Sequence, residues 1–457
     1  MILLSAKETL KQLTPGEKAA RVFFLAILLY IVFSLLVYGF FPRLQNWAFF
    51  MLGETRMMPS FADLRWVTSL SECSINLDEL AKGHLAGCDP WARGGLNYPP
   101  LSVEAARFLH VQGVHTGLLG FAFGIATISI LLGLLNQLLP DGWIKDLSAG
   151  LVLISFPLQL ALERCNIDII VFLLLTSIAA LAASLRVIAL PFTALAAWLA
   201  VAIKLYPFVG ILAWLVLGLF SKPPFDLWRA SCLFGGVLGF AASLPWFLKY
   251  GESAPQPLAG LISHSFVVPI PGNHANKILQ YTQSFPIVTE SFLNKLSIAL
   301  SLAIFFAVLL TCFRQRIPFL WAACLDHCPT GYVRRFLSAF PNLLGCTWLS
   351  CYFFSGSFDY RMILLVPVFI CMLSLLAHSS RDTQGLSVNT ACLTAASGFI
   401  CVLLPLLLPI ASRLSIPLVS STTNALIFMS DLLLMPIIAA GATSIIFKPP
   451  QVRCFQS

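Results

Sequence analysis

Short polar segments interrupt an otherwise apolar chain, and they hold the residues whose types could do chemistry. The residues that we single out are Asp63, Asp89, Asn97, Tyr98, Glu163, Arg164, Asn166, Asp168, Lys204, Tyr206, Asn273, His274, Asn276, Asp359, Tyr360 and Arg361. Ionisable groups at membrane depth are costly, which makes each of them a candidate for function. When the chain is threaded through a bilayer, all these segments come out on one side. That pattern is typical of a membrane enzyme with its site on the outer face.

Asp63 is the first candidate general base, because it lies not far beyond the first apolar run. A carboxylate within hydrogen-bond reach can take the proton from an attacking hydroxyl. Asp89, which precedes a proline, is the second candidate base. The alternative for Asp63 is a solvated loop acid or the cap of an interfacial helix.

Two other segments have residues suited to contact a ligand. Pro99 and Pro100 predict a stiff, extended strip that holds Asn97 and Tyr98, although the strip could equally be a rigid lead into the second apolar run. The segment 273–276 supplies two amides and an imidazole. It follows a Pro-Gly turn signal at 271–272, so an ordinary polar loop is its alternative.

Glu163, Arg164, Asn166 and Asp168 separate two apolar runs that would otherwise read as one. We expect a functional role for Glu163 and Arg164, since charged groups between membrane helices are costly. Asn166 is also a good N-cap for the next helix, and Asp168 would favour the positive end of its dipole. For these two residues, capping and function stay open alternatives.

Cations at two expected outer helix ends suit an anionic headgroup. Lys204 precedes Leu205, Tyr206 and a proline, and Arg361 follows Asp359 and Tyr360. Arginine can bind phosphate oxygens in bidentate fashion. The alternatives are snorkelling of Lys204 to the interface and a salt bridge between Asp359 and Arg361.

Composition determines which elements must position these residues. The chain of 457 residues is 58% hydrophobic and 11% charged, with a mean hydropathy of +0.87, which excludes a water-soluble globule. We expect an all-α polytopic membrane protein with about 12 transmembrane helices, since each span needs about 20 apolar residues. The predicted spans are 21–41, 113–134, 147–162, 167–185, 187–203, 205–220, 230–247, 296–313, 336–354, 362–377, 391–410 and 425–447.

Lys and Arg gather in short connections that the positive-inside rule places in the cytoplasm. The net charge of +8 is therefore a topology signal and does not indicate nucleic-acid binding. We expect both termini inside, the long loops 42–112 and 249–295 outside, and one membrane domain over 1–457. The 13 cysteines lie mostly in apolar runs without metal-ligand spacing. Cys73 and Cys88, both in the first outer loop, either pair as a disulfide or stay free thiols.

The motifs, taken in order, resemble glycosyltransferase family 87, part of the GT-C superfamily of polyprenyl-phosphate-sugar-dependent membrane glycosyltransferases. They read Asp-Leu-Arg, Asp-Pro, Asn-Tyr-Pro, Glu-Arg-x-Asn-Ile-Asp, Lys-Leu-Tyr-Pro, Gly-Asn-His-x-Asn and Asp-Tyr-Arg, from Asp63 to Arg361. Two positions depart from the expected pattern. Cys165 stands where glycine is expected, and His274 where glutamine is commoner.

The resemblance implies a GT-C-like helical bundle in a bacterial inner membrane that transfers a sugar, with mannose favoured, from a polyprenyl-phosphate carrier to a hydroxyl of a glycolipid or glycan. It implies an inverting single displacement without a metal or other cofactor. The catalytic aspartate of the first outer loop matches Asp63 best and Asp89 next. Lys204, Arg164 and Arg361 would bind the donor phosphate. The sugar or acceptor cleft would be lined by Asn97, Tyr98, Glu163, Asn166, Asp168, Tyr206, Asn273, His274, Asn276, Asp359 and Tyr360.

A transporter or flippase of lipid-linked sugars is the alternative from another class. It would also need an anionic-lipid cleft and charge within the membrane. Transporters, however, often carry inverted repeats and expose polar sites to both faces, and neither feature is visible in this sequence.

Overall fold

The computed structural model describes residues 14–40, 61–71, 101–139, 141–219, 227–250, 331–354, 363–370 and 373. Within these ranges the chain forms helices and no strands, which confirms the all-α prediction. The helices are α2 (Pro15–Phe40), α3 (Ala62–Ser71), α5 (Leu101–Phe108), the 3₁₀ helix η2 (Gly113–His115), α6 (Thr116–Leu138), α7 (Trp143–Leu153), α8 (Phe156–Arg164), α9 (Ile167–Ser184), α10 (Ala189–Ile203), α11 (Pro207–Leu219), α12 (Leu227–Tyr250) and α16 (Gly331–Phe354).

Four described stretches are long and apolar enough to cross a bilayer: Pro15–Val37, Gly113–Leu138, Ile167–Ser184 and Leu227–Pro245. Helices α7 and α8 add a fifth if they form one span bent by 47°. The protein is therefore a helical, membrane-embedded chain. The predicted spans 296–313, 391–410 and 425–447 and part of 362–377 lie outside the described residues, so the total of about 12 stays a prediction.

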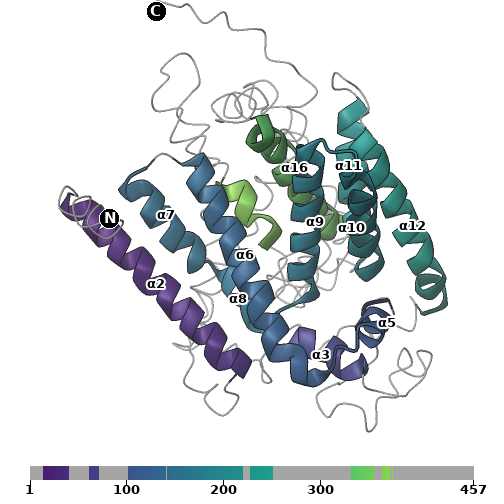
Figure 1. Ribbon diagram of the computed structural model, residues 1–457, viewed down its shortest axis with the longest axis horizontal. Coiled ribbons are helices and arrows are strands. Elements are labelled where there is room, and N and C mark those ends of the chain that lie inside the picture. Colours follow the sequence, from purple (N-terminus) through teal and green to yellow (C-terminus); the bar gives the residue numbers. More distant parts are fainter. Residues whose placement is uncertain are drawn as a thin grey trace, which may run out of the picture.

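The helices run up and down beside one another (Figure 1). Helix α2 packs on α6 and α7, α9 packs on α10 and α16, and α10 packs on α12. Buried apolar side chains form the core between them, among them Leu131, Val152, Phe172 and Trp348. The short helix α3 contacts the end of α8 and the start of α6, and its Val67 and Leu70 share an apolar cluster with Ile167 at the start of α9 and Ile203 at the end of α10. We call this the α3 end of the bundle.

Helices α10 and α12 approach closely along a stripe of small residues. On α12 the stripe repeats every four residues, at Ser231, Gly235, Gly239 and Ser243. These residues face four main-chain carbonyls of α10, those of Leu190, Ala194, Trp198 and Ala202. The serine hydroxyls donate hydrogen bonds of 2.5 and 3.2 Å to the outer two carbonyls. A Cβ at Gly235 would lie only 2.0 Å from the Ala194 oxygen, so the approach requires glycine there.

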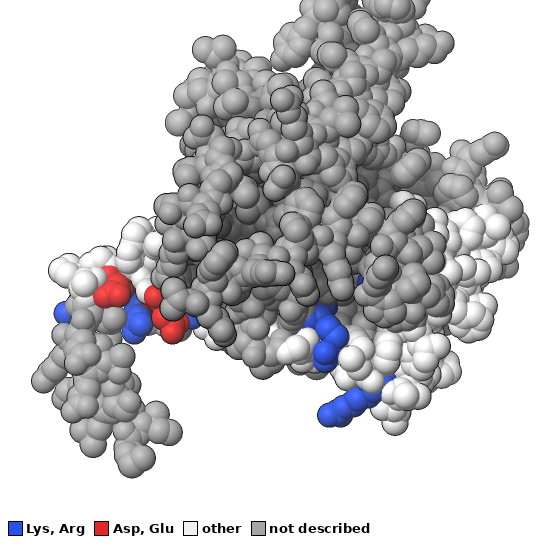
Figure 2. Space-filling view, turned by 90° about the horizontal axis from the view of Figure 1, so that it is seen from above, with Lys and Arg blue, Asp and Glu red and all other residues white. Residues whose placement is uncertain are grey.

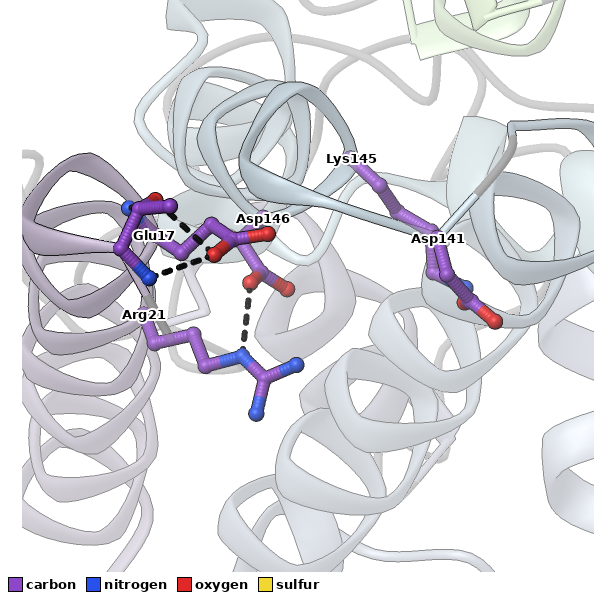
Figure 3. A network of polar contacts seen from close by, with 6 residues as sticks. Glu17, Arg21, Asp141, Lys145 and Asp146 are labelled. Carbon is purple, nitrogen blue, oxygen red and sulfur yellow. Dashed lines mark hydrogen bonds and ion pairs between the residues drawn. The ribbon is translucent and has the colours of Figure 1, made fainter. Parts of the chain in front are cut away.

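Two ion pairs lie at the end of the bundle opposite α3, and one of them joins two helices (Figure 3). Nε of Arg21 donates to Asp146 at 3.1 Å and ties α2 to α7, while Nζ of Lys145 lies 2.6 Å from Asp141. Glu17 accepts hydrogen bonds within the first turn of α2. Seen from above, acidic and basic side chains are mixed on the left of the described surface, and only basic ones are visible further right (Figure 2).

Candidate functional site

The backbone around Phe61 fixes the start of α3 and with it Asp63. Phe61 has a left-handed φ of 54°, and its N–H donates a 3.1 Å hydrogen bond to the carbonyl oxygen of Glu163 at the end of α8. Its ring packs directly on Gly120 of α6, where a Cβ would come within 2.5 Å of a ring carbon. These contacts hold Asp63, in the first turn of α3, against the end of α8.

The carboxylate of Asp63 forms a bidentate ion pair with the guanidinium of Arg164. Nε donates to Oδ2 at 2.9 Å, and Nη2 donates to Oδ1 at 2.5 Å. Both side chains are withdrawn from solvent, with exposed fractions of 8% for Asp63 and 21% for Arg164. Charge-assisted bidentate pairs of this kind fix both position and orientation. The sequence predicted Arg164 as a phosphate ligand, and in the structure its guanidinium lies on Asp63.

The side-chain amide of Asn166 makes two hydrogen bonds, one through its oxygen and one through its nitrogen. Oδ1 accepts a 2.9 Å hydrogen bond from the backbone N–H of Asp168, so Asn166 is the N-cap of α9. Nδ2 donates to Oδ2 of Asp63. The predicted cap is confirmed, and the capping contact itself directs Nδ2 towards Asp63.

Cys165 explains how two neighbouring side chains reach the same carboxylate. It ends α8 in the left-handed region, with φ 42° and ψ 51°, and is buried. This single residue lets α8 stop at Arg164 and α9 start at Ile167. A left-handed position favours glycine, since a Cβ adds strain there. Glycine, the residue expected here from the motif resemblance, would adopt this conformation without that strain.

A second polar contact lies beside the first. The phenol of Tyr206 donates a hydrogen bond to Oδ1 of Asp168, which is fully buried in the first turn of α9. Lys204 ends α10 as its C-cap, only 9% exposed, and Pro207 starts α11. Lys204 and Tyr206 thus belong to the α3 end of the bundle, like Asp63.

The hydrogen bonds around Asp63 are unevenly divided between its two oxygens. Among the described residues, Oδ2 accepts from both Arg164 and Asn166, whereas Oδ1 accepts only from Arg164. A carboxylate can accept about four hydrogen bonds. Oδ1 is therefore the oxygen with acceptor capacity left for an incoming hydroxyl.

The remaining predicted site residues lie outside the described part of the chain. These are Asp89, Asn97, Tyr98, Asn273, His274, Asn276, Asp359, Tyr360 and Arg361, together with Cys73 and Cys88. Their predicted roles stay predictions.

Glu163 is described and buried at 3% exposure, and its backbone carbonyl oxygen accepts the hydrogen bond from the N–H of Phe61. Within the described ranges, no group of three or more His, Cys, Asp or Glu residues could hold a metal ion.

Sequence reasoning missed the contacts that attach α3 to the start of α6. The hydroxyls of Thr68 and Thr116 share a buried hydrogen bond of 2.6 Å, and Ser71 donates to the carbonyl oxygen of Val111. The available signal was the spacing of Thr68 and Ser71, which places two hydroxyls on one face of α3. Because α3 carries Asp63, these two hydrogen bonds help to hold Asp63 in place.

No protein family, curated protein or solved structure matches this chain. What the site could do is therefore argued from its own residues. The buried carboxylate of Asp63 is held by the guanidinium of Arg164 and the amide of Asn166. A second buried carboxylate, Asp168, follows Asn166 by two residues, and the buried Lys204 ends α10. Burying ionisable groups at the end of a membrane helix costs free energy, so these groups are candidates for function.

Proposed function

We propose that this protein is a membrane glycosyltransferase similar to glycosyltransferase family 87. It moves a sugar, with mannose favoured, from a polyprenyl-phosphate carrier to a hydroxyl of a glycolipid or glycan. The observation that carries the proposal is the Asp63 carboxylate oriented by Arg164 and Asn166 at a membrane helix end. The ordered motifs from Asp63 to Arg361 supply the choice of reaction.

In this proposal the α3 end faces the outer side of a bacterial inner membrane, and both termini are cytoplasmic. Support comes from basic residues at the opposite helix ends, where Arg21 lies near the start of α2, Lys145 in α7 and Arg186 after α9. Arg335 donates to the carbonyl oxygen of Ala183 at that same end of α9. Basic residues favour the cytoplasmic side.

The reaction is a single inverting displacement. The acceptor hydroxyl oxygen attacks the anomeric carbon, its proton passes to Oδ1 of Asp63, and the bond from the anomeric carbon to the phosphate oxygen breaks. The departing lipid phosphate takes the bonding electron pair. Arg164 and Asn166 hold Asp63 so that Oδ1 meets the hydroxyl without having to reorient.

Negative charge builds up on the lipid phosphate as it leaves, and a nearby cation lowers the barrier. Lys204 is the cation that we assign to it first, because it is buried at the same end of the bundle as Asp63. Arg361 is the second candidate from the motif pattern. Tyr206 and Asp168 would orient the sugar or the loop that carries Lys204.

The test is sugar transfer by the purified full-length protein in liposomes. Radiolabelled polyprenyl-phosphate-mannose and polyprenyl-phosphate-glucose are the donors, and a total lipid and glycan extract is the acceptor. We compare wild type, Asp63→Asn and Asp141→Asn, the last being a carboxylate in an exposed ion pair at the far end. Asp63→Asn should be at least about 100-fold slower because a general base contributes about that much. Asp141→Asn should match the wild type.

Donor binding and folding are measured on the same samples. Asp63→Asn should still bind the donor, since the residue acts on the acceptor. Normal turnover in Asp63→Asn would move the base to Asp89 or elsewhere. Movement of labelled donor between leaflets without product would favour the transporter alternative.

A further inference from the structure

The turn between α5 and α6 exposes large apolar side chains. In the segment 108–115, which we call the 108–115 loop, Phe108 is 84% exposed, Leu109 66% and Val114 80%. Exposed apolar clusters of this kind mark a surface that something covers. The loop also holds polar side chains at His110, Gln112 and His115.

The loop continues the outward face of a membrane helix. Val114 and Leu118 are exposed one turn apart, and Ala122 is exposed one turn further along α6. All three belong to the candidate span Gly113–Leu138. Its 26 residues rise about 39 Å, which exceeds the roughly 30 Å of hydrocarbon in a bilayer. A span of this length extends beyond the hydrocarbon, and we place its first turns, beside the 108–115 loop, in the interfacial layer.

Backbone hydrogen bonds give the loop a defined shape. The N–H of Val111 donates to the carbonyl oxygen of Ala106 at 2.8 Å, and the N–H of Gln112 donates to Nδ1 of His115 at 3.0 Å. His110 takes a left-handed φ of 50° to make the turn. Phe108, Leu109 and Val114 are thus presented by a fixed turn.

The loop is fastened to the helix that carries Asp63. Thr116 shares its hydroxyl hydrogen bond with Thr68 of α3, and the Val111 carbonyl accepts from Ser71. Val111 also packs against a small apolar cluster to which α3 contributes Val67 and Leu70. A force on the loop is transmitted to α3 through these contacts.

We propose that the 108–115 loop is a lipid-embedded anchor, with Phe108, Leu109 and Val114 inserted into the boundary between headgroups and acyl chains. The bilayer that surrounds α6 is the occupant of this surface. By its ties to Thr68 and Ser71, the anchor holds α3, and so Asp63, at the level of the membrane surface. The insertion itself stands whether or not the protein transfers sugars.

Photocrosslinking in liposomes of phosphatidylethanolamine and phosphatidylglycerol tests the insertion. The photoreactive residue p-benzoyl-phenylalanine replaces Leu109 in the full chain, and mass spectrometry identifies its adducts. Val22 of α2 is the positive control because its exposed fraction is also 66%, and Asp141, whose side chain is 96% exposed, is the aqueous control. We expect lipid adducts at Leu109 as abundant as at Val22. Adducts to a second copy or to this chain, or no more lipid adduct than at Asp141, would overturn the proposal.

Hydrogen exchange tests the coupling to α3. Leu109→Asp puts a charge into the acyl boundary, whereas Leu109→Met keeps an apolar side chain of similar size. With Leu109→Asp, amides of residues 62–71 should exchange roughly tenfold faster in liposomes, because α3 loses its support. Leu109→Met should match the wild type. Equal exchange in all three proteins would refute the mechanical link, even where the crosslinks show insertion.

Discussion

Asn166 donates a hydrogen bond from Nδ2 to Oδ2 of Asp63 across a sequence separation of 103 residues. The other end of the same amide caps α9 through the backbone N–H of Asp168. One side chain therefore serves both local structure and the candidate base. Capping and function, which are alternatives when the sequence is considered alone, are not exclusive here.

Replacing Asn166 separates these two roles. Asn166→Ala removes the cap and the bond to Asp63, so the free energy of unfolding should fall by roughly 2–4 kcal/mol. Asn166→Asp keeps a cap acceptor but sets an oxygen against Asp63, so it should slow sugar transfer by about tenfold or more while α9 stays capped. Unfolding in mixed micelles and initial transfer rates measure the two effects. Transfer that falls only in proportion to the folded fraction would leave Asn166 as a cap alone.

Replacing Arg164 by alanine should lower the free energy of unfolding far more than replacing Arg21. Arg164→Ala leaves the buried Asp63 carboxylate without its guanidinium, which costs about 3–5 kcal/mol. Arg21→Ala breaks the pair with Asp146, whose side chains are 40% and 20% exposed, and should cost about 1 kcal/mol or less. Thermal unfolding in detergent compares the variants. Equal losses would mean that the Asp63 pair is no more protected than an ordinary surface pair.

Cys165 provides a test of the left-handed turn between α8 and α9. Cys165→Gly and Cys165→Ala both remove the thiol, but only glycine relieves the strain of a positive φ. Cys165→Gly should be about 1 kcal/mol more stable than Cys165→Ala. Unfolding in mixed micelles measures the difference. A more stable alanine variant would argue against the left-handed conformation at this position.

Two adjacent glycines of α12 test its contact with α10. Gly235→Ala would drive a methyl group into the Ala194 carbonyl and should cost about 1–3 kcal/mol. A Cβ at Gly236 meets its nearest atom, in the Phe208 ring, at an ordinary 3.5 Å. Gly236→Ala should therefore be neutral, or stabilising by up to about 1 kcal/mol through helix propensity. Gly235→Ala should therefore melt at a lower temperature than Gly236→Ala. The reverse order would contradict the packing of α12 on α10.

The sequence predicted the features that arise from composition and short-range signals. Long apolar runs predicted helices at 113–134 and 167–185, which the structure shows as α6 and α9. Asn166 predicted the N-cap of α9, because a cap involves only neighbouring residues. The alternation of spans predicted that Asp63, Arg164 and Lys204 would come out at one end, since each helix reverses the direction of the chain.

Which side chains meet at that end was decided by tertiary structure. A guanidinium can pair with any nearby carboxylate or phosphate, and no local signal links Arg164 to Asp63, which lies 101 residues earlier. Likewise, the spacing of the four small residues of α12 is visible in the sequence. That they pack against α10 is shown only by the folded structure. The sequence by itself determined a helical membrane chain and its polar ends, because these depend on hydrophobicity and local capping. The partners of Asp63 depend on how separate helices pack, which only the folded structure decides.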